Sequence, residues 1–106
     1  MKLVFMTHYV GFHDEVMGIL RSLGIRCYTR WREVEGQCSC GEAHDGTQVW
    51  PGLNTAVMVV VDADKARALL AALSRFNATV KDGGVDAYVV DVADAALAGG
   101  RQGYPG

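Results

Sequence analysis

The residues best suited to chemistry lie between positions 35 and 52. Two cysteines and a histidine, Cys38, Cys40 and His44, fall within seven positions of one another. Thiolate sulfur and imidazole nitrogen are ligands that zinc and Cu(I) prefer in proteins. The spacing lets all three side chains reach one ion, and a tetrahedral site needs a fourth ligand. The candidates for that ligand are Glu42, His8, His13 and a residue of a neighbouring subunit. The pattern predicts a metal-binding sensor or buffer.

Two other interpretations of these cysteines stay open. They are incidental small residues in an unstructured loop, or a redox switch in which Cys38 or Cys40 pairs across subunits. The chain has three cysteines in all, and two of them are too close in sequence to pair with each other. We therefore expect no disulfide framework and a reducing, cytoplasmic location.

Composition limits the classes of function. The chain has 106 residues, 50% of them hydrophobic, which suits one domain with one core. A net charge of −2 gives no general attraction to nucleic acid or to anionic membranes. No stretch approaches the roughly 18 apolar residues that a membrane span needs, and the start lacks the pattern of a signal peptide. No arrangement of residues typical of an enzyme emerges, so we expect a protein that is not an enzyme.

The elements that must position these residues follow from hydrophobic periodicity. The predicted order is strand, helix, strand, long loop, strand, helix, strand, which is the α+β ferredoxin-like βαββαβ fold with a long loop between strands 2 and 3. The predicted strands are 3–7, 25–34, 55–61 and 87–92. The predicted helices run from His13 to Leu23, followed by Gly24, and from an N-cap at Asp62 to Asn77.

The second predicted strand, 25–34, alternates in character. We expect one face in the core, including Cys27 and Trp31, and a second face that is basic and aromatic. Two interpretations of the arginines of that second face stay open. They are solvated or paired with acidic groups, or they bind an anion or a nucleotide phosphate. These arginines are Arg26, Arg30 and Arg32.

Three further residues could belong to a site. His8 and His13 flank the turn between the first strand and the first helix, where we expect helix-terminus residues rather than metal ligands. Trp50 either anchors the loop or contacts a partner.

Two helices can cover only one face of a four-stranded sheet. The other face would expose aromatic and aliphatic side chains as one patch. We therefore expect a closed symmetric oligomer with the uncovered faces at its centre.

The layout resembles the PII family of trimeric signalling proteins over residues 1–96. The most specific part is 88–96, Tyr-Val-Val-Asp-Val-Ala-Asp-Ala-Ala, which is similar to the last strand and following turn of that family. Residues 57–62 resemble its third strand and the exit into the second helix. The sequence Lys-Asp-Gly-Gly at 81–84 stands where the family has its nucleotide-contacting Gly-Asp-Gly-Lys loop.

The resemblance implies a homotrimer that senses a small-molecule effector and regulates a partner such as a membrane transporter through the loop at 35–52, which corresponds to the family's T-loop. It also implies adenine nucleotide bound in the cleft between subunits. The loop lacks the tyrosine that the family modifies, so uridylylation is not expected. Residues 1–97 would form the PII-like domain and 98–106 a flexible tail. The implied nucleotide-binding residues are Lys81, Asp82, Gly83, Gly84 and Arg101.

Overall fold

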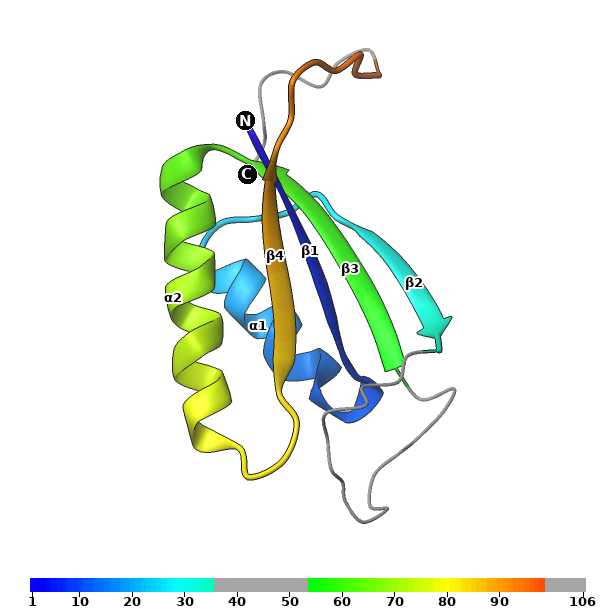
Figure 1. Cartoon of the computed structure of the whole chain (residues 1–106), viewed down its shortest axis with the longest axis vertical. Helices are drawn as coiled ribbons and strands as arrows, with labels where there is room; N and C mark the ends of the chain where they lie inside the picture. Colours follow the sequence, from blue (N-terminus) through cyan, green and yellow to red (C-terminus); the bar gives the residue numbers. More distant parts are fainter. Residues whose placement is uncertain (36–53, 99–106) are drawn as a thin grey trace.

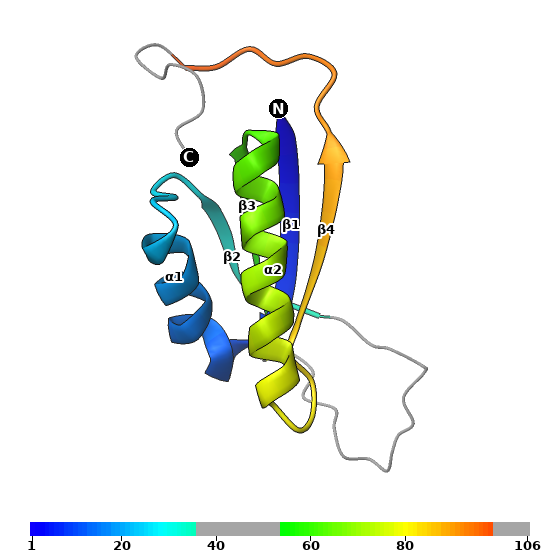
Figure 2. The ribbon, with the colours of Figure 1, turned by 90° about the vertical axis from the view of Figure 1, so that its left-hand side faces the viewer.

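The computed structural model describes residues 1–35 and 54–98. These residues form a four-stranded antiparallel sheet in the order β2-β3-β1-β4, with two helices packed on one face (Figures 1 and 2). This is the ferredoxin-like α+β fold that the sequence predicts. The elements in chain order are β1 (Lys2–Tyr9), the short 3-10 helix η1 (Val10–Phe12), α1 (His13–Ser22), β2 (Thr29–Val34), β3 (Asn54–Val61), α2 (Ala63–Thr79) and β4 (Val85–Asp91).

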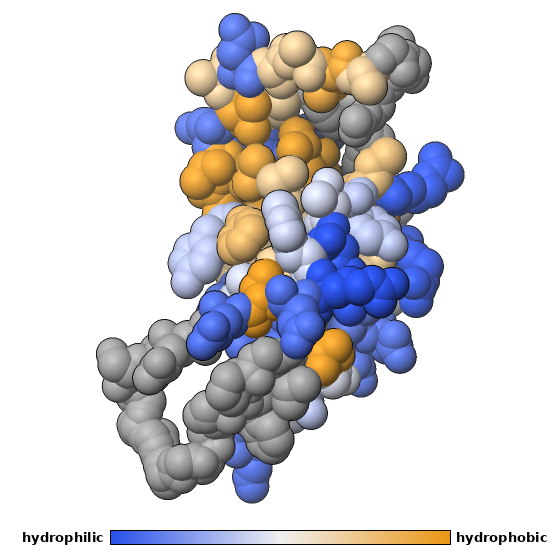
Figure 3. Space-filling view, turned by 90° about the vertical axis from the view of Figure 1, so that its right-hand side faces the viewer, coloured by the Kyte–Doolittle hydropathy of each residue, from blue (hydrophilic) through white to orange (hydrophobic). Residues whose placement is uncertain are grey.

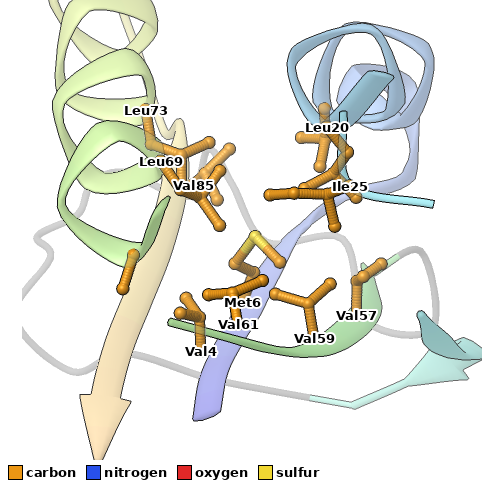
Figure 4. Packing of buried hydrophobic residues seen from close by; sticks show 12 residues of the cluster. Val4, Met6, Leu20, Ile25, Val57, Val59, Val61, Leu69, Leu73 and Val85 are labelled. Carbon is orange, nitrogen blue, oxygen red and sulfur yellow. The ribbon is translucent and has the colours of Figure 1, made fainter. Parts of the chain in front are cut away.

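The core lies between the sheet and the two helices. In β1 the buried residues Val4, Met6 and His8 alternate with half-buried ones, because successive side chains of a strand point to opposite faces. Met6 sits at the centre, between the valines of the sheet and the leucines of both helices (Figure 4). Truncating one such leucine to alanine costs about 2–5 kcal/mol. The buried cluster consists of Val4, Met6, Val16, Leu20, Ile25, Val57, Val59, Val61, Ala66, Leu69, Leu73 and Val85.

The helix ends form as local sequence signals predict. The carboxylate of Asp62 caps α2 by accepting a hydrogen bond of 2.8 Å from the Lys65 amide. Gly24 follows α1 with a φ of 75°, a conformation that glycine adopts without strain. The helix α2 continues to Thr79, two residues beyond its predicted end. Among the described residues, no helix is both long enough and apolar enough to cross a membrane.

The prediction for the second strand was wrong in two respects. The strand starts at Thr29, because Ile25 instead closes α1 through a hydrogen bond to the Leu20 carbonyl and fills the core. Cys27 therefore lies outside the strand and is exposed rather than buried. Trp31 is also not a core residue. It pairs with Ala56, packs edge-on against Phe5 on the face away from the helices, and is 43% exposed.

The sheet face away from the helices is uncovered, as the sequence predicts. We call it the open face. Figure 3 shows hydrophobic side chains gathered over the upper part of this side of the molecule, with charged side chains lower down. Tyr88 is 61% exposed and Val90 53% exposed, which is unusual for large apolar residues of a strand. Strand alternation assigns to the open face Leu3, Phe5, Trp31, Met58, Val60, Tyr88 and Val90.

Candidate functional site

Three connections meet at one end of the sheet, which we call the loop end. There β1 leads through η1 into α1, β3 begins after residues 35–53, and β4 begins after the turn at 80–84 (Figure 1). The register places Tyr9 opposite Asn54 and His8 opposite Val85. Val34, the last residue of β2, also pairs with Asn54. Both ends of the long connection therefore lie at the same end of the sheet as the turn that precedes β4, although β3 and β1 separate β2 from β4.

The side chain of Asn77 holds that turn. Its Nδ2 donates to the Val85 carbonyl at 2.9 Å, and its Oδ1 accepts from the Val85 amide at 2.7 Å. The turn itself uses backbone conformations that favour glycine, with φ of 81° at Gly83 and 124° at Gly84. A Cβ atom added to Gly84 would overlap Asn77 Oδ1. The amide side chain thus fits closely against a bare glycine backbone.

An aromatic cluster joins the turn to the β1–α1 connection. Phe12 packs edge-on against Phe76 of α2, with ring centroids 5.4 Å apart, and against Tyr9 at 5.7 Å. A Cβ atom on Gly83 would lie 3.8 Å from the Phe12 ring, so the ring also borders the turn. Contacts of this kind stabilise by about 0.5–1.5 kcal/mol beyond their buried area. The turn is therefore supported by the two hydrogen bonds between Asn77 and Val85, which we call the Asn77 clamp, and by the ring of Phe12.

Two histidines form a hydrogen-bonded pair at the loop end. His8 Nε2 lies 3.2 Å from His13 Nδ1. The two ring planes differ by 6° and the centroids are 5.5 Å apart. That separation is about the nitrogen-to-nitrogen distance plus two ring radii, so the rings lie end to end in one plane rather than face to face. One ring therefore donates a straight N–H···N hydrogen bond to the other.

The environment of this pair favours neutral imidazoles. Burial, with the positive charges of His13 and Arg30 adding to it, lowers the pKa of His8 from 6.5 to about 4. The pKa of His13 is also lowered, first by burial and then by Arg30 and Arg32, whereas Asp14 opposes the shift. Among the described residues, no group forms a hydrogen bond with the buried His8 Nδ1. The pair is therefore uncharged at neutral pH.

Arg30 approaches the pair from β2. Its Nε donates to Thr55 Oγ1 at 3.0 Å, and that hydroxyl donates to the Trp31 carbonyl at 2.9 Å. Thr55 is fully buried, so its hydroxyl needs these partners. Arg30 is half-buried and bonded to a neutral group, whereas Arg26 and Arg32 are exposed. Anion binding by these arginines stays a prediction.

The residues predicted for nucleotide binding fall partly at the loop end. Lys81, Asp82 and Gly83 are exposed in the turn before β4, and Gly84 is half-buried against Asn77. Arg101 and Trp50 lie outside the described residues.

The predicted metal ligands Cys38, Cys40 and His44 also lie outside the described residues. Within 1–35 and 54–98, no group of three or more His, Cys, Asp or Glu side chains is placed to hold a metal ion. The straight hydrogen bond between His8 and His13 leaves no room for an ion between the two nitrogens. Metal binding through the cysteines stays a prediction.

Sequence reasoning missed two residues of this site. Asn77 was identified only as the end of a helix, although an asparagine next to a Lys-Asp-Gly-Gly turn is a residue type that bonds backbone groups of turns. Thr55 was assigned to a strand for its β-branched side chain alone. Its buried hydroxyl has no sequence signal, because its partners come from another strand.

Comparison with solved structures shows the fold of PII-like proteins. A protein from Thermus thermophilus, described as a PII-like signalling protein, matches with a TM-score of 0.62 and 23% identity, over 86% of this chain and 85% of that chain. CPII from Thiomonas intermedia, a nitrogen regulatory PII-like protein bound to ADP, AMP and bicarbonate, matches with a TM-score of 0.63 and 16% identity, over 90% and 94%. No family model and no curated protein matches the sequence.

Proposed function

We propose that this chain is a divergent PII-like signalling protein that works as a regulator rather than an enzyme. Its homotrimer would bind an adenine nucleotide at the loop end and change the surface that residues 35–53 present to a partner. The observation that carries this proposal is the meeting of three connections at one end of a PII-like fold. A ligand held by the turn at 80–84 would lie at the end of the sheet where β2 ends and β3 begins.

The chemistry of the turn supports a phosphate-bearing ligand. Gly83 is exposed and has no side chain, so a ligand can approach its backbone closely. Lys81 adds a positive charge that is exposed to solvent. CPII was solved with ADP and with AMP, and the sequence at 81–84 resembles the family's nucleotide loop. An adenine nucleotide is therefore the first ligand to test.

Isothermal titration with ADP, AMP and ATP tests nucleotide binding. We expect wild-type protein to bind at least one of them, and Lys81→Gln to lose about tenfold in affinity through loss of a charge-assisted contact. Arg67→Gln is the matched control. It removes one positive charge from the opposite end of α2, in an exposed pair with Asp64 that contributes little to stability. Absence of heat with all three nucleotides would overturn this part of the proposal.

The open face supports self-association. Exposed large apolar residues on a sheet usually mark an interface, and a closed ring of three copies would cover all of them. Light scattering after size exclusion measures the mass directly. We expect three times the 11.4 kDa of one chain. A monomer at micromolar concentration would contradict the trimer.

The partner and location belong to the same proposal. The resemblance to the PII family points to a membrane transporter, contacted from the cytoplasm through residues 35–53. Tagged protein should co-purify with a membrane protein from detergent-solubilised membranes, and addition of ADP should change the amount recovered. A variant that lacks residues 37–51 should recover none. Equal recovery by that variant would show that the loop does not form the contact.

A further inference from the structure

We infer that Asn77 is a positioning residue that sets the turn at 80–84 in the shape that receives the ligand, an inference that rests on the proposed nucleotide site. Asn77 does not need to touch the ligand for this role. It acts through the backbone of Val85 and through close contact with Gly84.

The hydrogen bonds show how the clamp works. The amide of Asn77 bonds both the N–H and the C=O of a single residue, Val85, at 2.7 and 2.9 Å. Val85 is the first residue of β4, is 4% exposed and pairs with His8 in the sheet. The clamp therefore links the last turns of α2 to the first residue of β4, at the two ends of the connection that contains the turn at 80–84. These two anchors restrict the conformations open to the residues between them.

The residue type is otherwise unfavourable at this position. Asn77 lies inside α2, which continues to Thr79, and asparagine forms helices less readily than alanine. The stability of the helix alone therefore does not account for asparagine at this position. Its two donors and one acceptor oxygen match the backbone of Val85, which a hydroxyl or an aliphatic side chain could not do.

The geometry of the turn makes this clamp relevant to binding. Gly83 and Gly84 both have positive φ, a conformation that is only one of several open to glycine in a free loop. A ligand that binds such a turn must bear the cost of ordering it, unless the protein has already done so. The clamp and the Phe12 ring order the turn before binding. Asn77 thus raises the affinity for the ligand by ordering the turn in the unbound protein.

The test compares Asn77→Ala with Thr79→Ala. Thr79 lies at the same end of α2, and its hydroxyl bonds the Phe76 carbonyl of its own helix rather than the turn, so it is a matched control. We expect Asn77→Ala to speed exchange of the Val85 amide proton, measured by NMR, and to weaken ADP binding about tenfold. Thr79→Ala should change neither. Asn77→Asp keeps an acceptor oxygen for the Val85 amide but sets a second oxygen against the Val85 carbonyl, so it should restore protection from exchange only in part.

The outcomes separate the inference from the proposed function. If wild-type protein does not bind ADP, the proposed nucleotide site fails, and the exchange of Val85 still decides whether Asn77 holds the turn. If Asn77→Ala leaves Val85 exchange unchanged, the inference fails whatever the titration gives. If exchange speeds up but ADP affinity stays at the wild-type value, the clamp is structural only and the inference is overturned.

Discussion

At the scale of single residues, His8 combines burial with a group that titrates. It is 3% exposed, faces Arg30 and His13, and bonds the latter in the plane of both rings. A second proton on either ring would place positive charge beside the Arg30 guanidinium in a poorly solvated site. The free energy of unfolding should therefore depend on pH through this neutral pair.

The sign of that dependence follows from the direction of the pKa shift. The pKa of His8 is lowered to about 4 in the folded chain, against 6.5 when unfolded, so between these values the unfolded chain binds more protons. The contribution is complete above pH 6.5 and is lost as the pH falls toward 4, by about 3 kcal/mol in total. Urea unfolding at fixed protein concentration should show this loss. His8→Leu should show a clearly flatter profile, and an unchanged profile would contradict the assignment.

The residue scale also shows where sequence reasoning stops. Asp62 and Gly24 were predicted correctly as helix ends, because both signals act over a few neighbouring residues. Cys27 and Trp31 were assigned to the wrong environment. Cys27 precedes the strand, which starts at Thr29. The face that Trp31 occupies depends on register with the neighbouring strand, and β2 is an edge strand of the described sheet. The clamp by Asn77 was missed because its partner lies eight residues away across a turn.

At the scale of elements, the capped start of α2 offers a clean comparison. The carboxylate of Asp62 accepts from the Lys65 amide, so Asp62→Ala should lower the free energy of unfolding by about 1 kcal/mol. Asp64→Ala removes a carboxylate from the first turn of the same helix, but only an exposed pair with Arg67 is lost. Urea titration should therefore separate the two variants. Equal losses would assign the effect of Asp62 to charge at the helix start rather than to the cap.

Replacing glycine by alanine should destabilise the turn between α2 and β4 but stabilise α1. Gly84→Ala forces a residue with Cβ to a φ of 124° and into overlap with Asn77, which should cost about 2 kcal/mol or more. Gly18→Ala lies inside α1, where the nearest atom to an added Cβ is 4.0 Å away, and should stabilise by about 0.5–1 kcal/mol. Thermal unfolding of both variants tests the opposite signs. A Gly84→Ala variant with an unchanged unfolding temperature would contradict the prediction of strain at this position.

The order of elements was easier to predict than the way they meet. Periodicity identified all four strands and both helices of the described chain, with ends shifted by at most four residues. The meeting of three connections at the loop end follows from the topology, since antiparallel neighbours bring the end of β1 beside the starts of β3 and β4. The contacts within that end, such as His8 with His13, needed the structure.

At the scale of the whole molecule, the sheet has two different faces. One face buries its valines and Met6 under α1 and α2, so its stability is internal to one chain. The open face presents Tyr88, Val90 and Trp31 to solvent in an isolated chain. The proposed trimer would bury these residues, and the resemblance to the PII family implies nucleotide bound between its subunits. Ligand binding and assembly should therefore depend on each other.

That dependence gives the last prediction. Tyr88→Asp places a charge at the most exposed large apolar residue of the open face. It should dissociate the proposed trimer to monomers, because a buried, unpaired carboxylate costs several kcal/mol. Ser74→Asp adds the same charge on the exposed side of α2 and should leave the mass unchanged. Light scattering measures both, and titration of the Tyr88→Asp monomer should show weakened ADP binding. A trimer that survives Tyr88→Asp would place the interface elsewhere, and full ADP affinity in the monomer would place the nucleotide within a single chain.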